Sequence, residues 1–268
     1  MAGHVLYRYL NSLDKYEMHN SSRSKLNEKT IILDIFNIQK VENLIRKLRP
    51  DVIINCIGIL VKESNENPDK AIFVNSYFPH YLERITRETS SKLVHLSTDC
   101  VFSGEDGNYT EDIIPDGQDY YARSKALGEI INKKDLTIRT SIIGPELKKK
   151  GNGLFHWFMN QKTKVNGYKN VLWTGVTTLQ LAKAIDKGIE KNLNSLYHLV
   201  PESKISKYSL LKLISKIWNK NIKIKPVNEP KSDKSLVNTR KDFDYIVPNY
   251  EKMVKNLYKW MNNWNYRY

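Results

Sequence analysis

The first half of the chain alternates short apolar runs with longer amphipathic stretches, and this alternation restricts the fold more than any other feature. Short apolar runs are typical of buried strands, and apolar residues spaced three or four positions apart are typical of helices. Strand–helix repeats with right-handed crossovers give a doubly wound, mostly parallel sheet. We therefore predict an α/β, Rossmann-like fold. The expected helices are 3–13, 37–48, 68–89 (kinked at Pro79) and 119–132, and the expected strands are 16–19, 30–33, 52–54, 92–96 and 136–139.

The second half of the chain is less regular. Residues 151–175 contain several glycines and two tryptophans, which indicates a loop-rich lobe. We expect a Rossmann-like domain at 1–150, to which 177–200 returns, and a smaller C-terminal substrate lobe formed mainly by 151–268. Helices are expected at 177–190, 206–218 and 250–264, and strands at 195–200 and 222–227.

The net charge of +14 raises the question of a polyanionic partner. The basic residues are scattered and no nucleic-acid-binding motif is visible, so we expect no nucleic-acid partner. A positive cleft would instead attract phosphorylated ligands. No apolar run is long enough to span a bilayer and no secretory signal is visible, so we expect a cytoplasmic protein with no membrane partner. Cys56 and Cys100 are too few for a disulfide framework or a zinc site, so no metal is expected.

The amino-terminal sequence lacks the opening of a standard dinucleotide-binding fold. Such a fold begins with a strand and a glycine-rich turn, but helical spacing here starts at Gly3. Gly3 would suit the third glycine of that turn, which lets the first helix pack closely on the sheet. Three explanations stay open: the start lies further upstream, the chain is a fragment, or the protein does without the strand. Loss of a central strand would expose two strand edges, so we expect lower stability or weaker cofactor binding.

The sharpest chemical motif is Tyr121-Ala122-Arg123-Ser124-Lys125, near the start of a predicted helix. Tyr121 and Lys125 are four residues apart and therefore lie on one helical face. A nearby ammonium favours the phenolate and lowers the pKa of a tyrosine. Such a tyrosine can donate a proton to a carbonyl oxygen as hydride reaches the carbon. This spacing is common by chance, and a surface pair is the alternative.

A second motif, Ser97-Thr98-Asp99, directly follows the predicted strand 92–96. Open α/β sheets bind ligands at the carboxyl ends of their strands. A hydroxyl there can hydrogen-bond a substrate carbonyl beside the tyrosine. The alternative for Ser97 and Thr98 is a turn or a helix cap, and Asp99 is expected to fix the local turn rather than to act as a base.

Together these motifs resemble a known family. Ser-Thr-Asp-Cys-Val-Phe-Ser-Gly at 97–104, Tyr109-Thr110-Glu111-Asp112, the Tyr-x-x-x-Lys motif and Gly128-Glu129 are similar to dTDP-4-dehydrorhamnose reductases and related sugar-nucleotide reductases of the extended short-chain dehydrogenase/reductase group. The resemblance runs from Gly3 to about Ser215. It implies reduction of the 4-keto group of a nucleotide-linked 6-deoxysugar for polysaccharide synthesis, with Thr98, Tyr121 and Lys125 as the catalytic set. It also implies a nucleotide-sugar substrate and a homodimer as one option.

The resemblance further implies which residues contact the cofactor and the substrate. Arg23 could pair with a 2′-phosphate, so NADPH is favoured over NADH. Asp34 could instead cap the next helix, Asn75 could hold a neighbouring loop, and Trp173 could pack between lobes. The implied cofactor residues are Gly3, Arg23, Asp34, Cys56, Ile57, Gly58, Asn75, Ser97, Tyr121, Lys125 and Ser141, and the implied substrate residues are Thr98, Asp99, Val101 and Trp173.

Two other functions remain open. One is a sugar-nucleotide epimerase on the same scaffold; a dehydratase is disfavoured because Cys100 and Val101, rather than an acid–base pair, follow Asp99. The other is a non-catalytic, NADP-binding regulatory subunit, as in the regulatory subunit of methionine adenosyltransferase. The complete Thr–Tyr–Lys set argues against the second option, whereas the lack of the glycine-rich turn argues for it.

Overall fold

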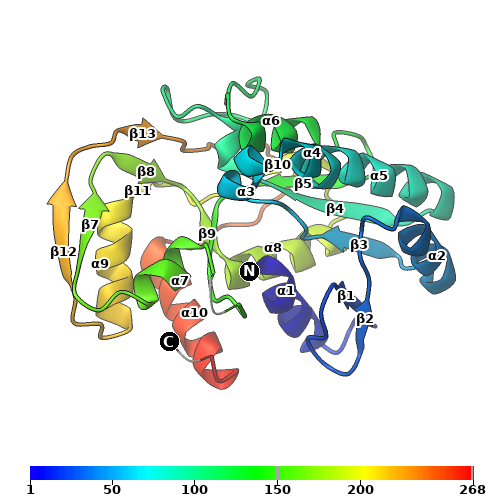
Figure 1. The fold of residues 1–268 in the computed structure, drawn as a ribbon, viewed down its shortest axis with the longest axis horizontal. Coiled ribbons are helices and arrows are strands. Elements are labelled where there is room, and N and C mark those ends of the chain that lie inside the picture. Colours follow the sequence, from blue (N-terminus) through cyan, green and yellow to red (C-terminus); the bar gives the residue numbers. More distant parts are fainter. Residues whose placement is uncertain (149–150, 267) are drawn as a thin grey trace.

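The structure is a computed structural model that describes residues 1–148, 151–266 and 268. Its centre is a sheet of four parallel strands in the order β10-β5-β4-β3 (Figure 1). These strands are β3 (Val52–Asn55), β4 (Lys92–Ser97), β5 (Leu136–Arg139) and β10 (Ser195–His198). Parallel neighbours require crossover connections, and helices fill them. The prediction of an α/β, Rossmann-like fold is confirmed.

Helices cover both faces of the sheet, and side chains of β4 alternate between the two cores. Val94 joins a core built with α1 (Ala2–Asn11), α8 (Thr178–Glu190) and α10 (Tyr250–Asn263). Leu93 joins the opposite core, built with α2 (Ile38–Leu48), the π-helical segment η1 (Ile72–Tyr77) and α5 (Phe78–Thr89). The two faces are visible in Figure 1, with α5 on one side of the sheet and α1 and α8 on the other. Burial of both faces explains the continuous apolar runs in the strands.

Helix α2 illustrates how local sequence sets the ends of an element. The Asn37 side chain accepts a hydrogen bond from the Lys40 N–H at 3.0 Å, and Arg49 adopts a left-handed conformation before Pro50. Asn37, not Asp34, therefore caps the helix.

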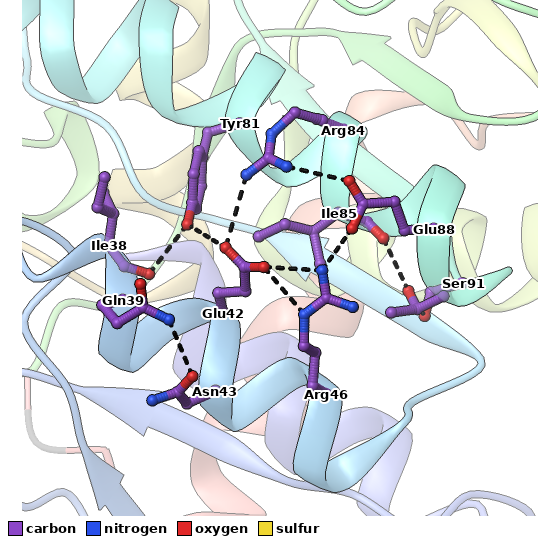
Figure 2. A network of polar contacts seen from close by, with 11 residues as sticks. Ile38, Gln39, Glu42, Asn43, Arg46, Tyr81, Arg84, Ile85, Glu88 and Ser91 are labelled. Atoms are coloured by element: carbon purple, nitrogen blue, oxygen red, sulfur yellow. Dashed lines mark hydrogen bonds and ion pairs between the residues drawn. The ribbon is translucent and has the colours of Figure 1, made fainter.

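A polar network joins α2 to α5 on the protein surface (Figure 2). Glu42 accepts hydrogen bonds from Arg46 at 2.7 Å and from the Tyr81 hydroxyl at 2.8 Å, and Arg84 and Glu88 of α5 extend the network. Exposed ion pairs of this kind contribute little to stability. The network orients the two helices relative to each other.

The prediction of a strand at 16–19 is wrong, because the first strand in the structure is β1 (Asn20–Ser22). Residues 12–16 form turns instead, and the Tyr16 hydroxyl donates to Asp186 of α8 at 2.8 Å. Strand β1 pairs in parallel with β2 (Thr30–Ile32) as a separate two-stranded sheet. Within the described residues, no strand pairs with the second edge of β1 or with the outer edge of β3.

Two predicted helices differ in detail from the structure. The helix expected at 68–89 consists of α4 (Pro68–Ala71), η1 and α5, and its irregularity is the π-helical segment before Pro79. The helix expected at 119–132 is α6 (Tyr120–Leu127), which ends earlier, before Gly128. A Cβ on Gly128 would lie 1.8 Å from the Asn75 carbonyl oxygen. The close approach of η1 therefore requires glycine at this helix end.

The region 151–175 is more regular than the sequence indicates. It contains α7 (Leu154–Met159), β7 (Lys164–Tyr168) and β8 (Val171–Trp173). Strand β12 (Lys223–Val227) pairs in parallel with β7. Strands β11 (Ile205–Ser206) and β13 (Ser232–Asp233) flank β8. These strands lie beside helix α9 (Lys207–Ile217), on the left of Figure 1. The remaining elements are α3 (Val61–Glu66), the 3-10 helix η2 (Asp99–Val101), β6 (Ile142–Ile143) and β9 (Val176–Thr177), of which β6 pairs with β9.

Candidate active site

The carboxyl end of β4 turns sharply into η2 and places three polar side chains in a buried position. Ser97 ends the strand, and Thr98 caps η2 by accepting a hydrogen bond from the Cys100 N–H at 3.1 Å. The Thr98 hydroxyl donates to the Asp99 carboxylate at 3.0 Å. Asp99 thus holds the turn that presents Thr98 at the sheet edge where open α/β folds bind ligands.

Helix α6 brings Tyr121 and Lys125 to this strand end. Asp119 starts the helix by accepting from the Ala122 N–H at 2.7 Å. Tyr121 and Lys125 lie one helical turn apart, and both are buried at 8% and 4% exposure. The surface-pair alternative for the Tyr-x-x-x-Lys spacing is therefore wrong. We call Thr98, Tyr121 and Lys125 the strand-end site.

Burial raises the pKa of the Tyr121 phenol above its ordinary value, and the nearby acidic groups Cys100, Asp99 and Asp119 act in the same direction. A hydrogen bond with the Thr98 side chain partly offsets this rise in the pKa. The phenol is therefore protonated at neutral pH, which is the form from which a general acid starts.

The Lys125 side chain is bonded to strand β4 in this structure. Its Nζ donates to the Leu96 carbonyl at 2.6 Å and lies 3.3 Å from the His95 Nε2. Burial lowers the pKa of Lys125 to about 8, although the Glu129 carboxylate acts to raise it. The sequence predicts that Lys125 lowers the pKa of Tyr121. In the structure the pKa of Tyr121 is raised instead, because burial is the largest influence on the pKa of both groups.

A buried ion pair lies beneath the strand-end site, and the sequence analysis did not identify it. Arg139 of β5 forms two hydrogen bonds with Glu129, at 2.7 and 2.6 Å, and Ser97 donates to the same carboxylate at 2.6 Å. The Arg139 guanidinium also lies 3.3 Å from the His198 Nε2. The Ser97 hydroxyl, predicted to contact the cofactor, faces this pair instead. An arginine in a buried strand that has no other charged residue was the signal that could have revealed it.

Asn75 of η1 fixes the loop that follows β3. Its side-chain oxygen accepts from the Ile59 N–H at 2.9 Å, and its NH2 group donates to the Ile59 carbonyl and to Ser124, both at 3.1 Å. The side chain has no solvent exposure. Asn75, predicted as a cofactor residue, therefore holds the loop and α6 together, which was the alternative for this residue.

The same loop carries three predicted cofactor residues, Cys56, Ile57 and Gly58, and it lies against the start of α1. A Cβ on Gly3 would lie 3.5 Å from the Cys56 Cβ, and one on Gly58 would lie 3.5 Å from the Asn75 side-chain oxygen. The structure thus brings Gly3 and Cys56 together at the carboxyl end of β3. Small residues at this junction let the backbones approach closely.

The residues predicted for the adenosine half of the cofactor lie on the protein surface. Arg23 follows β1, is exposed, and forms no ion pair within the described residues. Asp34 accepts from the Phe36 N–H at 3.1 Å, and the Phe36 ring, which is 48% exposed, stacks on Phe73 with ring centroids 4.9 Å apart. We call Arg23, Asp34 and Phe36 the cofactor rim. A shallow hollow beside it is lined by Ile32, Asp34, Phe36, Asn37, Ile38, Gln39 and Lys40.

Two residues predicted to bind substrate are covered by protein. Val101 has no exposed side-chain surface and belongs to a small apolar cluster. Trp173 is 2% exposed, with the Lys207 ammonium 5.3 Å from its ring centroid and the Tyr250 ring at 5.8 Å. Neither side chain is open to a ligand in this structure. Ser141, the remaining predicted cofactor residue, lies just after β5 and its carbonyl accepts from the Val176 N–H at 2.8 Å.

No group of three or more His, Cys, Asp or Glu side chains in the described part of the chain is placed to hold a metal ion. Among the helices that the structure describes, none has the length and apolar character needed to cross a membrane.

Comparison with known families identifies the scaffold on which this site is built. The model of the RmlD substrate binding domain matches residues 3–242, which include the whole sheet, the strand-end site and the cofactor rim. The chain belongs to this family. The match also covers β7, β8 and α9, so the C-terminal strands described above are part of the family region.

Individual relatives of this RmlD-family chain match over shorter stretches. A "Probable low-salt glycan biosynthesis reductase" of Haloferax volcanii is 33% identical over 117 residues, which are 41% of this chain and 39% of that protein. A dTDP-4-dehydrorhamnose reductase of Streptomyces griseus is 34% identical over 99 residues, 36% of this chain and 33% of that protein. The chain thus matches only about two fifths or less of the length of these curated relatives.

Solved structures match over nearly the whole chain. A hypothetical dTDP-4-dehydrorhamnose reductase of Sulfolobus tokodaii shares 28% identity, covers 93% of this chain and 94% of its own, and has a TM-score of 0.79. A dTDP-4-dehydrorhamnose reductase of Bacillus anthracis, solved in complex with NADP, shares 22% identity, covers 96% and 95%, and has a TM-score of 0.80. At that identity the second match supports the fold alone.

Proposed function

We propose that this protein reduces the 4-keto group of a nucleotide-linked 6-deoxysugar, with NADPH as the hydride source and NADH as the less favoured cofactor. The observation that carries the proposal is the convergence of Thr98, Tyr121 and Lys125 at the carboxyl end of β4. A buried, protonated phenol beside a hydroxyl is the arrangement that a carbonyl reduction requires. Membership of the RmlD family and the names of the matching reductases point to the same reaction.

The chain's own residues fit a dinucleotide along the edge of the sheet. Arg23 offers a guanidinium that forms no ion pair among the described residues for a 2′-phosphate, and Asp34 and the exposed Phe36 ring border a hollow suited to adenosine. At the other end, Lys125 can hold a ribose hydroxyl. When bound, NADPH supplies the hydride.

Within the site, Tyr121 would donate its proton to the sugar oxygen while the Thr98 hydroxyl holds that oxygen in place. Lys125 would need to turn from the Leu96 carbonyl toward the phenol to favour the phenolate that proton transfer leaves behind. The Asp99 carboxylate keeps the Thr98 hydroxyl oriented during this step.

Turnover of dTDP-4-dehydrorhamnose with NADPH tests the proposal. We expect loss of NADPH absorbance and formation of the reduced sugar, and we expect Tyr121→Phe to lower kcat by about 10²- to 10⁴-fold because the acid is removed. Tyr120→Phe, on the exposed side of the same helix, is the matched control and should retain activity.

Two results would favour the other functions. Interconversion of sugar epimers without net NADPH consumption would support an epimerase. NADPH binding, followed by tryptophan fluorescence, with no turnover of any nucleotide-linked 4-keto sugar would support a non-catalytic NADP-binding subunit.

We also propose a homodimer and a cytoplasmic location. The neighbouring elements η1 and α6 expose apolar side chains, and such patches mark association sites. These side chains are Ile72, Tyr77 and Leu127. Analytical ultracentrifugation of the wild type and of Leu127→Glu tests the dimer, which the charge should weaken. Cell fractionation tests the location, which the use of NADPH and a nucleotide-linked sugar supports.

A further inference from the structure

His95 is a polar side chain in the middle of an apolar strand. It lies on β4 between Asn55 of β3 and Thr137 of β5, and it has no solvent exposure. A buried imidazole needs partners for both ring nitrogens. Here the two partners are Asn55 on one side and Lys125 on the other.

The hydrogen bonds of Asn55 determine which ring nitrogen of His95 carries the proton. The Asn55 side-chain oxygen accepts from the Ile57 N–H at 3.1 Å, so its NH2 group faces the His95 Nδ1, also at 3.1 Å. Nδ1 must therefore accept. Burial, reinforced by Lys125 and then His80, lowers the pKa of His95 well below its usual value, so the ring is neutral. A neutral ring that accepts at Nδ1 carries its hydrogen at Nε2.

This Nε2–H points at the Lys125 nitrogen, 3.3 Å away. An ammonium group has only donors, so it cannot accept this hydrogen. A neutral amine can accept from Nε2–H and still donate to the Leu96 carbonyl at 2.6 Å. Among the other charged groups nearby, Glu129 acts to raise the pKa of Lys125, but its carboxylate is already paired with Arg139. His80 is exposed and bonded to the Leu127 carbonyl.

We propose that His95 is a positioning residue that holds the neutral amine form of Lys125 at the Leu96 carbonyl, through a hydrogen-bonded chain from Asn55. Asn55 starts the loop with Cys56, Ile57 and Gly58, so the chain links this loop to helix α6. Uptake of a solvent proton by Lys125 breaks the bond from Nε2–H and releases the resulting ammonium toward Tyr121. This proposal rests on the proposed function, because it takes Lys125 to be part of the reductase site.

Nitrogen NMR of the full chain, without any ligand, tests the proposal. With ¹⁵N-labelled histidine, we expect His95 in the wild type to show the Nε2–H form. With ¹⁵N-labelled lysine, assigned with Lys125→Met, we expect the pKa of Lys125 to rise by about one unit in His95→Leu, because the opposing donor is gone. His80→Leu is the matched control and should leave the pKa of Lys125 unchanged.

The sign of the shift separates this proposal from its opposite. If Nε2 accepted from an ammonium, His95→Leu would lower the pKa of Lys125, and that result overturns the proposal. An Nδ1–H form of His95 in the wild type also overturns it, and this measurement does not depend on whether the variant folds. Neither NMR measurement needs a sugar substrate. A lack of reductase activity would therefore refute the proposed function, while the NMR result would still decide the role of His95.

Discussion

The strand-end site and the cofactor rim are assigned to one reaction, yet they are built in different ways. Thr98, Tyr121 and Lys125 are buried and held by hydrogen bonds from three elements. Arg23 and Phe36 are exposed, and Arg23 has no ion pair among the described residues. Catalytic side chains must be held in place and shielded from water, whereas side chains that recognise a charged ligand can be exposed to solvent before the ligand binds. Substitutions at and beneath the strand-end site should therefore lower the stability of the fold, whereas substitutions at the cofactor rim should lower the affinity for the cofactor.

The largest stability effect is expected beneath the strand-end site. Glu129→Leu would leave the Arg139 guanidinium buried without its partner, at 2% exposure. We expect a loss of about 3–5 kcal/mol in the free energy of unfolding, measured by urea denaturation. The double variant Glu129→Leu/Arg139→Met should lose much less, because no charge remains buried. Arg46→Met in the exposed α2–α5 network should change the midpoint little, and an equal loss there would contradict the comparison.

Lys125 should also contribute to the pH dependence of stability. The pKa of Lys125 falls from 10.5 to about 8 on folding. Between these values the unfolded chain binds more protons at this site, so the free energy of unfolding rises with pH as Lys125 loses its proton in the folded state. We expect Lys125 to contribute a gain of about 2 kcal/mol between about pH 7.5 and 9.5, measured as the difference between the wild type and Lys125→Met. Lys125→Met should lack this gain, while Lys70→Met, on the surface, should keep it.

Asn75 belongs to η1, which contacts both regions: Asn75 donates to Ser124 of α6, and Phe73 stacks on Phe36. Asn75→Ala leaves the buried N–H and carbonyl of Ile59 without partners, so we expect a loss of about 1–3 kcal/mol in the free energy of unfolding. The loosened loop should also weaken NADPH binding, measured by tryptophan fluorescence. Asn43→Ala, on the surface of α2, is the control. Unchanged stability in Asn75→Ala would show that the loop does not depend on this side chain.

The sequence predicted what depends on near neighbours in the chain. Helical spacing placed Tyr121 and Lys125 on one face, and the strand 92–96 placed Thr98 at its carboxyl end. These features follow from periodicity and turn chemistry within about ten residues. The same local patterns could not reveal that Lys125 turns to Leu96, because burial of the finished core decides that orientation.

What the sequence missed depends on contacts between distant segments. The Asn55–His95–Lys125 chain requires the register of β3 against β4, and the Glu129–Arg139 pair requires the packing of the α6 end on β5. Periodicity does not give strand register. Strand β7 was missed for another reason: its Lys164, Asn166 and Tyr168 side chains are exposed, so it lacks the apolar run of a buried strand. The strand predicted at 222–227 is confirmed as β12 (Lys223–Val227).

The smallest effect is expected at the cofactor rim, and it should appear in affinity alone. Arg23→Ala removes the guanidinium that we assign to the 2′-phosphate, and a charge-assisted hydrogen bond of about 1.5 kcal/mol corresponds to about tenfold weaker NADPH binding. NADH lacks that phosphate, so its affinity should not change, and neither should the free energy of unfolding, because Arg23 is exposed. Lys25→Ala, two residues further in the same loop, is the control for a general loss of positive charge. Equal weakening of both cofactors would assign Arg23 to the shared part of the dinucleotide, and the preference for NADPH would then need another origin.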